Sequence, residues 1–409
     1  MQPGALRLNA PQHETKVVGL ICTGHFFSHF YLLLVPPLFP VLREAYGVGF
    51  TELGFAIAAF SVASGFTQIP VGFLVDRYGA RQLLIWGLFS ESIAISLIGV
   101  FPVYGALVTL LIAAGLANSV FHPADYAILN ATVANTRIGR VFSFHTFTGY
   151  LGDAVAPVTV LLLAGLLGWR VALFACGIMG TLVAGLMWMN SELLVDATHA
   201  RHAPGKAAAD DGRQRLRGLA LILSVPVLMG MLFFATMSIA GASVRTFGIS
   251  ALHELYATSL GAAGLVVSVY LFVSPVGVLA GGYAADRISR HDIVASACIL
   301  VMAGCIFSIA AFDPPIFVIG VLLGIAGFFN GFLAPPRDMI VRSLAPPGEM
   351  GKVFGFVSSG YALAGIIGPV LYGWLLDHSD PRNVFWVGGV VALLTIVTVL
   401  VTGRAGRRA

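Results

Sequence analysis

Charged side chains are scarce in this chain of 409 residues. Asp, Glu, Lys and Arg together make up 10% of it, against roughly 25% in soluble domains. Hydrophobic residues make up 58%, and the mean hydropathy is +0.90. A soluble fold has too little polar surface to cover so much apolar surface. The scarcity of charge therefore predicts an all-α membrane protein, because each crossing helix needs about 20 apolar residues.

Cysteine is also rare, which excludes a disulfide-rich protein. The four cysteines all fall inside apolar runs: Cys22, Cys176, Cys298 and Cys305. They are expected to be small buried residues, not a disulfide framework or a metal cluster. The net charge of +4 is small, so nucleic acid is not an expected partner. The sequence has no loop of the type Gly-x-x-x-x-Gly-Lys-Ser/Thr, which argues against transport driven by ATP, and no cofactor is predicted.

Twelve apolar runs are long enough to cross a membrane. The first continues from Val17 to Pro40 without a cleavage pattern, which favours a retained helix over a signal peptide. The predicted spans of the first half are 17–41, 53–75, 83–101, 104–130, 141–166 and 169–189. Those of the second half are 218–245, 259–284, 293–311, 316–341, 353–376 and 384–402. We therefore predict a six-helix bundle over 1–189, a flexible cytoplasmic linker over 190–217 and a second six-helix bundle over 218–409.

Basic residues give a check on this map, because cytoplasmic loops carry an excess of Lys and Arg. If both termini are cytoplasmic, the outer loops hold only Arg43, Arg170 and Arg382 of the 23 basic residues. Most of the others fall in the inner loops and at the termini. The bias predicts a multi-pass protein of the bacterial inner membrane with both termini in the cytoplasm.

The two halves repeat one another. At a shift of 212 residues, Asn118 falls on Asn330 and Pro123 on Pro335. The segment 139–142 likewise falls on 351–354. The repeat pairs span 4 with span 10 and span 5 with span 11 in the same orientation. Two such halves around a central cavity are the usual design of a secondary transporter.

A short charged motif also occurs twice, each time where a predicted span ends. Its first copy is a loop from Gly72 to Arg81, and its second is a loop from Gly282 to Arg287. The glycines leave room for a helix of the other half. The aspartates are placed to meet a neighbouring helix N-terminus. The gating residues predicted from the motif are Gly72, Asp76, Arg77, Arg81, Asp286 and Arg287. A plain topological anchor is the alternative.

The motif resembles the signature of the major facilitator superfamily, Gly-x-Leu-x-Asp-Arg-x-Gly-Arg-Lys/Arg-x-x-Leu. The matching residues are Gly72, Leu74, Asp76, Arg77, Gly79, Arg81 and Leu84, and Ala80 departs from the pattern. The resemblance implies two pseudo-symmetric six-helix bundles, with spans 1, 4, 7 and 10 around a central cavity. It also implies that the motif is a latch on the cytoplasmic face.

The segments His25–Arg81 and Phe121–Pro123 are similar to efflux proteins of the fosmidomycin-resistance type. Two departures weaken the inference of drug antiport. Leu111 stands where proton-driven members often carry Arg, and Ala156 replaces a glycine of the span-5 pattern.

Polar residues inside a membrane are candidates for function. We predict that six of them bind the substrate: His25, His29, Asn118, His122, Arg245 and Asn330. His25 and His29 are one helical turn apart and share a face, and packing or hydrogen bonding is their alternative role. Two histidines without a third ligand are a weak metal signal, so no metal site is predicted. Arg245 is expected either to draw an anion inward or to reach the headgroups.

Three residues are candidates for coupling transport to protons: Asp153 first, then His29, then Glu91. Asp153 and Glu91 are isolated carboxylates near the middle of spans 5 and 3, where a proton can be exchanged at physiological pH. A hydrogen bond to a neighbouring helix is the alternative role of each.

Asp125 and Arg337 are the remaining predicted gating residues. They align under the 212-residue shift, and both lie nearer the cytoplasmic end than Asn118 and Asn330. We expect them to pair across the two halves when the cytoplasmic face is closed. A pairing of Arg337 within its own half is the alternative.

The sequence thus predicts a secondary transporter that moves a small organic solute by rocker-switch alternating access. Proton coupling and efflux are favoured, with proton-coupled uptake of an organic anion or a metal chelate as the alternative. The expected partners are the solute, protons and the lipid bilayer, and the protein is expected to act as a monomer. A membrane enzyme and a non-transporting sensor are the competing classes. We predict no enzyme, because the sequence has no His, Asp and Glu cluster with metal-ligand spacing at one membrane face.

Overall fold

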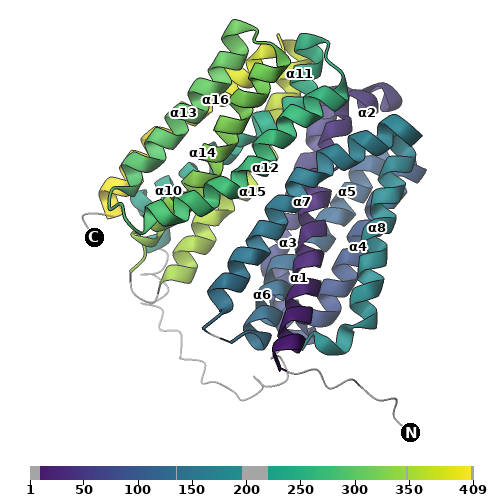
Figure 1. The fold of residues 1–409 in the computed structure, drawn as a ribbon, viewed down its shortest axis with the longest axis vertical. Coiled ribbons are helices and arrows are strands. Elements are labelled where there is room, and N and C mark those ends of the chain that lie inside the picture. Colours follow the sequence, from purple (N-terminus) through teal and green to yellow (C-terminus); the bar gives the residue numbers. More distant parts are fainter. Residues whose placement is uncertain (1–9, 135, 196–219, 347–348, 407–409) are drawn as a thin grey trace.

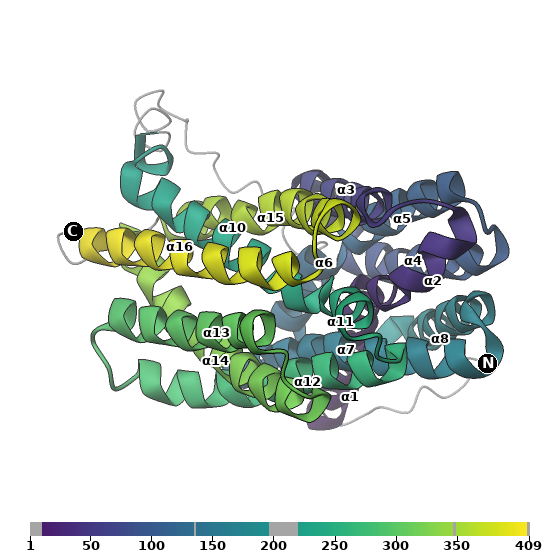
Figure 2. The same cartoon turned by 90° about the horizontal axis from the view of Figure 1, so that it is seen from above.

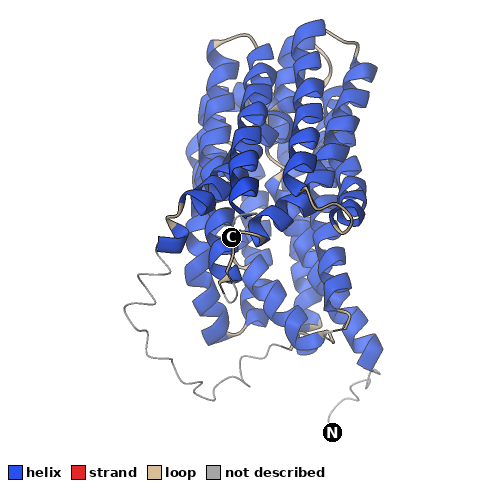
Figure 3. Cartoon of the chain, turned by 90° about the vertical axis from the view of Figure 1, so that its left-hand side faces the viewer, coloured by secondary structure: helices blue, strands red, loops and turns tan. Residues whose placement is uncertain are grey.

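The computed structural model describes residues 10–134, 136–195, 220–346 and 349–406. Every regular element in this described part of the chain is a helix, and none is a strand (Figure 3). Twelve helical segments of the described part are long and apolar enough to cross a membrane. The prediction of an all-α membrane protein with twelve spans is therefore confirmed.

The helices form two sets that lie side by side (Figure 1), as the view from above also shows (Figure 2). The first set is α1 (Ala10–Leu32), η1 (Pro36–Leu38), α2 (Phe39–Tyr46), α3 (Phe50–Tyr78), α4 (Ala80–Val100), α5 (Tyr104–Asn118), α6 (Phe121–Thr132), α7 (Ile138–Leu167), α8 (Trp169–Met189) and η2 (Ser191–Leu193). The second set is α10 (Val225–Arg245), α11 (Gly248–Tyr256), α12 (Leu260–Ala285), α13 (His291–Phe312), α14 (Ile316–Arg342), α15 (Met350–His378) and α16 (Arg382–Gly406). Of the predicted linker, 196–217 lies outside the described residues.

Two of the predicted spans are interrupted. The first consists of α1, η1 and α2, because Pro36 has no N–H to donate to the carbonyl of Leu32, where α1 ends. The fourth is broken between α5 and α6 at Ser119 and Val120. Pro123 favours this break, since it has no N–H to donate to the carbonyl of Ser119.

The break in the fourth span corrects one prediction. On the continuous span 104–130 predicted from the sequence, Asn118, His122 and Asp125 would share one face, because they are spaced at i, i+4 and i+7. Asn118 instead ends α5, while His122 and Asp125 belong to α6. Their side chains therefore reach different surroundings.

The repeated charged motif is helical where a loop was predicted. α3 continues to Tyr78, so Gly72 and Arg77 lie in its last turns, and only Gly79 separates α3 from α4. Gly79 has φ 94°, a backbone conformation that favours glycine. In the second copy α12 ends at Ala285, directly before Asp286.

Glycines bring α12 and α14 into close contact. A Cβ atom at Gly327 of α14 would lie 2.8 Å from backbone atoms of Tyr270 in α12. A Cβ atom at Gly281 of α12 would lie 2.8 Å from the Cα of Phe332 in α14. Neither position has room for a side chain, so the two backbones pack directly on each other.

We expect Gly327→Val to destabilise the protein, because overpacking a well-packed contact costs about 1–3 kcal/mol. Gly304→Val on α13 is the matched control, since a Cβ atom there would meet nothing within 4 Å. Thermal unfolding of both variants in detergent should show a lower midpoint for Gly327→Val only. Equal shifts in the two variants would contradict the packing account.

The two sets contact each other at the end of the molecule that carries α2 and α11, here called the gate face. The rings of Phe39 and Phe247 lie 5.3 Å apart between centroids. Nη1 of Arg43 lies 3.4 Å from Oε1 of Glu254. The opposite end carries the α3–α4 and α12–α13 junctions and is here called the charged face.

Asp377 makes the strongest polar contact between the two sets. Its carboxylate ends α15 and accepts hydrogen bonds from the backbone N–H of Phe50 at 2.9 Å and of Thr51 at 2.7 Å. The hydroxyl of Thr51 donates a third, at 2.6 Å. Asp377 therefore caps the N-terminus of α3, where the helix dipole favours a negative charge. Between described residues, the hydrogen bonds and ion pairs that join the two sets all lie at the gate face.

Candidate functional site

Histidines and aspartates gather where α1, α6 and α7 meet. They are His25 and His29 of α1, His122 and Asp125 of α6, and His145 and Asp153 of α7. A functional role was predicted from the sequence for all of them except His145. The structure brings them together from three segments that are far apart in the chain.

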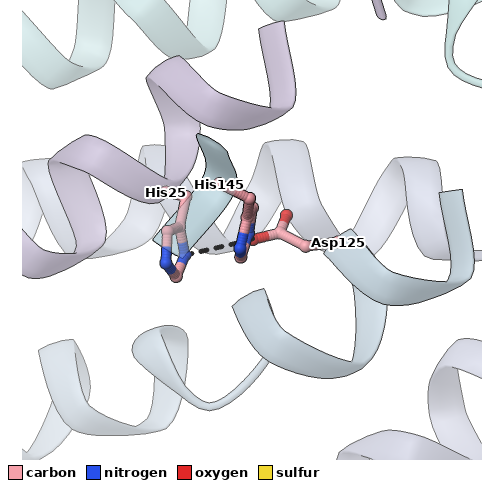
Figure 4. A group of neighbouring side chains, drawn as sticks. All are labelled: His25, Asp125 and His145. Atoms are coloured by element: carbon pink, nitrogen blue, oxygen red, sulfur yellow. Dashed lines mark hydrogen bonds and ion pairs between the residues drawn. The ribbon is translucent and has the colours of Figure 1, made fainter. Parts of the chain in front are cut away.

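Asp125 is the centre of the buried part of this group (Figure 4). Its Oδ2 accepts a hydrogen bond from Nε2 of His145 at 2.9 Å and lies 3.3 Å from Nδ1 of His25. The rings of His25 and His145 stack with their centroids 3.6 Å apart. All three residues are almost fully buried. This trio, His25, Asp125 and His145, is here called the buried triad.

A second pair lies beside the buried triad. Nδ1 of His29 lies 3.3 Å from Oδ1 of Asp153, within hydrogen-bond distance. Asp153 is buried, whereas the His29 side chain is 28% exposed. Gly149 of α7 makes room for the imidazoles, since a Cβ atom there would lie 2.9 Å from Nε2 of His25 and 3.0 Å from Nε2 of His29.

His122 stands at the exposed edge of the group. Its ring lies 5.4 Å from that of His25 and 6.4 Å from that of His29. It stacks on Tyr126, and both residues are exposed. The group therefore extends from an exposed imidazole to fully buried side chains.

Asn118 and Glu91 form a separate polar contact. The amide Nδ2 of Asn118 donates to Oε1 of Glu91 at 3.0 Å and to the backbone carbonyl of Ser28 at 3.4 Å. The hydroxyl of Ser64 donates to Oδ1 of Asn118 at 3.3 Å. Glu91 is fully buried. Its predicted alternative role, a hydrogen bond to a neighbouring helix, is observed, and its role in proton coupling stays a prediction.

Arg245 of the second set faces the first set. Electrostatic interactions connect it with His29 and Tyr150, and within its own set with Tyr270. It is half-buried and makes no hydrogen bond or ion pair with a described residue. Its guanidinium therefore has donors without a partner among the described residues, and contact with a solute stays a prediction.

Asn330 lies on α14 in the second set. Its Nδ2 donates to the hydroxyl of Ser274 at 3.4 Å, and Asn330 is half-buried. Contact with a solute stays a prediction for Asn118 and Asn330 alike.

The predicted pair of Asp125 and Arg337 is not formed in this structure, and it stays a prediction for a closed cytoplasmic face. Asp125 is buried inside the first set among histidines. Arg337 donates from Nε to Oδ1 of Asp338 at 2.9 Å and from Nη1 to the hydroxyl of Tyr361 at 2.6 Å. Its guanidinium also lies over the Phe234 ring, 4.8 Å from the centroid. In this conformation Arg337 pairs within its own half, which is the alternative named for it.

The residues of the repeated motif, for which gating was predicted, lie at the charged face. Arg77 and Arg287 are exposed and lie over the rings of Tyr78 and Tyr283. Arg81 donates to the backbone carbonyl of Ser191 at 3.4 Å.

Two expectations about the motif differ from the structure. A Cβ atom at Gly72 or Gly282 would meet nothing within 4 Å, so no helix of the other set approaches these glycines here. Asp286 is exposed, and the side chain of Asp76 lies outside the described part. The latch therefore stays a prediction.

His145 and Asp377 were not predicted from the sequence. A signal for His145 was present, because His145 and Gly149 are four residues apart on α7 and Asp153 comes after four more, so the three share a face. The role of Asp377 depends on contact with Phe50 and Thr51, more than three hundred residues away in the chain, and has no local signal.

Comparison with known proteins identifies the family. The family model of the Major Facilitator Superfamily matches residues 21–252 and 232–408. A bacterial homologue of the human lysosomal transporter Spinster, solved in an inward-facing and occupied conformation, superposes with a TM-score of 0.74 at 12% identity, covering 97% of both chains.

Two curated relatives match nearly the whole chain. The fosmidomycin resistance protein of Escherichia coli is 23% identical over 395 residues, covering 94% of this chain and 92% of the relative. The probable L-galactonate transporter of Escherichia coli is 25% identical over 374 residues, covering 86% and 81%. The predicted resemblance is confirmed, and the family consists of transporters, not enzymes. This chain belongs to the major facilitator superfamily and is a multi-pass secondary transporter of small solutes.

Proposed function

We propose that the chain couples the movement of a small organic solute to protons by rocker-switch alternating access. The two six-helix bundles, 1–189 and 218–409, move against each other as two bodies joined by the linker 190–217. The protein works as a monomer in the bacterial inner membrane. Substrate contacts come from both bundles, with Arg245 and Asn330 in the second and His29 in the first.

The observation that carries the proposal is the buried position of the Asp153 carboxylate. It is a buried carboxylate near the middle of α7, and its described hydrogen-bond partner is His29. His29 and Tyr150 of the first set lie near Asp153, and each also interacts electrostatically with Arg245 of the second set. A carboxylate in this position takes up a proton from one side of the membrane and releases it to the other as the bundles move. His29 and Tyr150 thus connect the proton carrier with Arg245, which contacts the solute.

We place the charged face in the cytoplasm, with both termini, because most of the basic residues gather there. The gate face is then the outer face. Its closure by Asp377, Arg43 and Phe39 supports a state that is open toward the cytoplasm.

Export is the favoured direction, supported by the similarity to the fosmidomycin resistance protein. Proton-coupled uptake of an organic anion is a second candidate. Arg245 favours it, because a half-buried guanidinium without an acidic partner among the described residues attracts an anion. The similarity to a probable L-galactonate transporter agrees with it.

The test is flux in proteoliposomes across a compound panel with and without an imposed pH gradient. Fosmidomycin, L-galactonate, sulfoacetate and a neutral sugar are suitable probes. We expect one probe to move faster when the gradient is present, and the sign of the effect gives export or uptake. A flux that is the same with and without the gradient would contradict proton coupling.

A further inference from the structure

We propose that the buried triad, His25, Asp125 and His145, binds one divalent transition-metal ion. This inference goes beyond the proposed function and does not depend on it. The sequence showed only two histidines on α1, and no metal site was predicted from them. The structure adds a carboxylate from α6 and a third imidazole from α7.

The donor atoms of the triad converge. One ligand atom from each residue can be chosen so that all three lie within 4.8 Å of one another. The three residues come from α1, α6 and α7, and their exposed fractions are 2%, 0% and 1%. Donors held by three packed helices are pre-organised, so little side-chain freedom is lost when an ion binds.

Two buried atoms of the triad have no hydrogen-bond partner among the described residues: Nδ1 of His25 and Oδ1 of Asp125. Nδ1 of His25 lies 3.3 Å from the carboxylate but without hydrogen-bond geometry. A buried polar atom without a partner is costly. A metal ion bound between these atoms removes both costs, since imidazole nitrogen and carboxylate oxygen are its ligands.

The charge of the triad also favours a cation. Asp125 forms ion pairs only with His25 and His145 among the described residues, and neither Lys nor Arg takes part. A charged carboxylate without Lys or Arg beside it is strongly unfavourable in an apolar interior. A divalent ion reverses that imbalance.

The donor set selects the class of ion. Imidazole suits zinc, copper, iron and nickel, whereas magnesium and calcium prefer oxygen ligands. Two histidines and one carboxylate match the three protein ligands of zinc sites that keep a fourth position open. His122 and His29 provide an entry path, because His122 is exposed and both rings adjoin His25.

The experiment is equilibrium dialysis of chelator-treated, tag-free protein against Zn²⁺, followed by metal analysis. We expect one ion per chain. Asp125→Asn and His145→Gln should each weaken binding by more than about 10–100-fold, the cost of losing only an outer-shell partner of a metal site. His253→Gln on α11 is the matched control, because Nδ1 of His253 donates a hydrogen bond to the carbonyl of Thr258 and His253 lies outside the triad.

Co²⁺ supplies a second readout, since its visible absorption reports direct coordination by nitrogen and oxygen. The spectrum should appear in the unmodified protein and in His253→Gln, and vanish in His145→Gln. Elution as a single species checks that each variant is folded. The proposal is overturned if Zn²⁺ does not bind, or if the triad variants bind it as well as the control. In that case, flux that responds to the pH gradient in metal-free proteoliposomes would still support the proposed function.

Discussion

Asp153→Asn is expected to uncouple transport from the pH gradient. Asn has nearly the same size and still accepts a hydrogen bond from His29, but it carries no exchangeable proton. Coupling between two ligands is a free energy of about 1–3 kcal/mol, so the gradient-driven flux should fall about 5–150-fold. Solute exchange without a gradient should persist, because the bundles can still move. Proteoliposome flux with and without the gradient measures both quantities.

Glu91→Gln is the matched control for this prediction. Glu91 is also buried, and Gln keeps an oxygen that accepts from Nδ2 of Asn118. The control should keep most of the gradient-driven flux. If the gradient still drives flux through Asp153→Asn but no longer drives flux through Glu91→Gln, the proton carrier is Glu91 and the assignment to Asp153 is wrong.

Asp377→Asn is expected to open the gate face. The change removes the charge that caps α3 and leaves an amide that cannot accept from all three donors. A hydrogen bond to a charged group contributes about 1.5–3 kcal/mol. Losing one such bond shifts the ratio of closed to open molecules about tenfold, since about 1.4 kcal/mol is a factor of ten. Spin labels on α2 and α11 would report the shift as a longer distance distribution.

The control at the same face is Arg43→Gln. Arg43 and Glu254 are 3.4 Å apart and largely exposed, and exposed pairs contribute about 0–1 kcal/mol. Loss of this ion pair should leave the distances between the spin labels on α2 and α11 nearly unchanged. A gate face that stays closed in Asp377→Asn would show that apolar packing, such as that of Phe39 on Phe247, suffices for closure.

The twelve spans could be predicted because each is a long apolar run, a property of local sequence. Their interruptions were harder to predict. Pro36 and Pro123 disfavour an uninterrupted helix, but the sequence did not indicate that α5 would end at Asn118. Since a break of two residues rotates the helix that comes after it, the faces of His122 and Asp125 could not be derived from a continuous helix.

Most residues of the candidate site could be predicted from the sequence, but the contacts between them could not. Polar residues in apolar runs pointed to His25, His29, Asp125 and Asp153. Which of them touch depends on the packing of α1 against α6 and α7, which no single segment encodes. Asp125 was therefore paired with Arg337 by the repeat, whereas packing gave it His145.

The central claim is that closure of the gate face alternates with opening during transport. A bis-maleimide cross-link between Arg43→Cys and Glu254→Cys in proteoliposomes tests it most directly. The four native cysteines are buried, which limits side reactions. The account predicts that cross-linking lowers flux of the transported probe to the level of protein-free liposomes, while the unlinked double variant transports normally. Flux that continues unchanged after complete cross-linking would contradict the account.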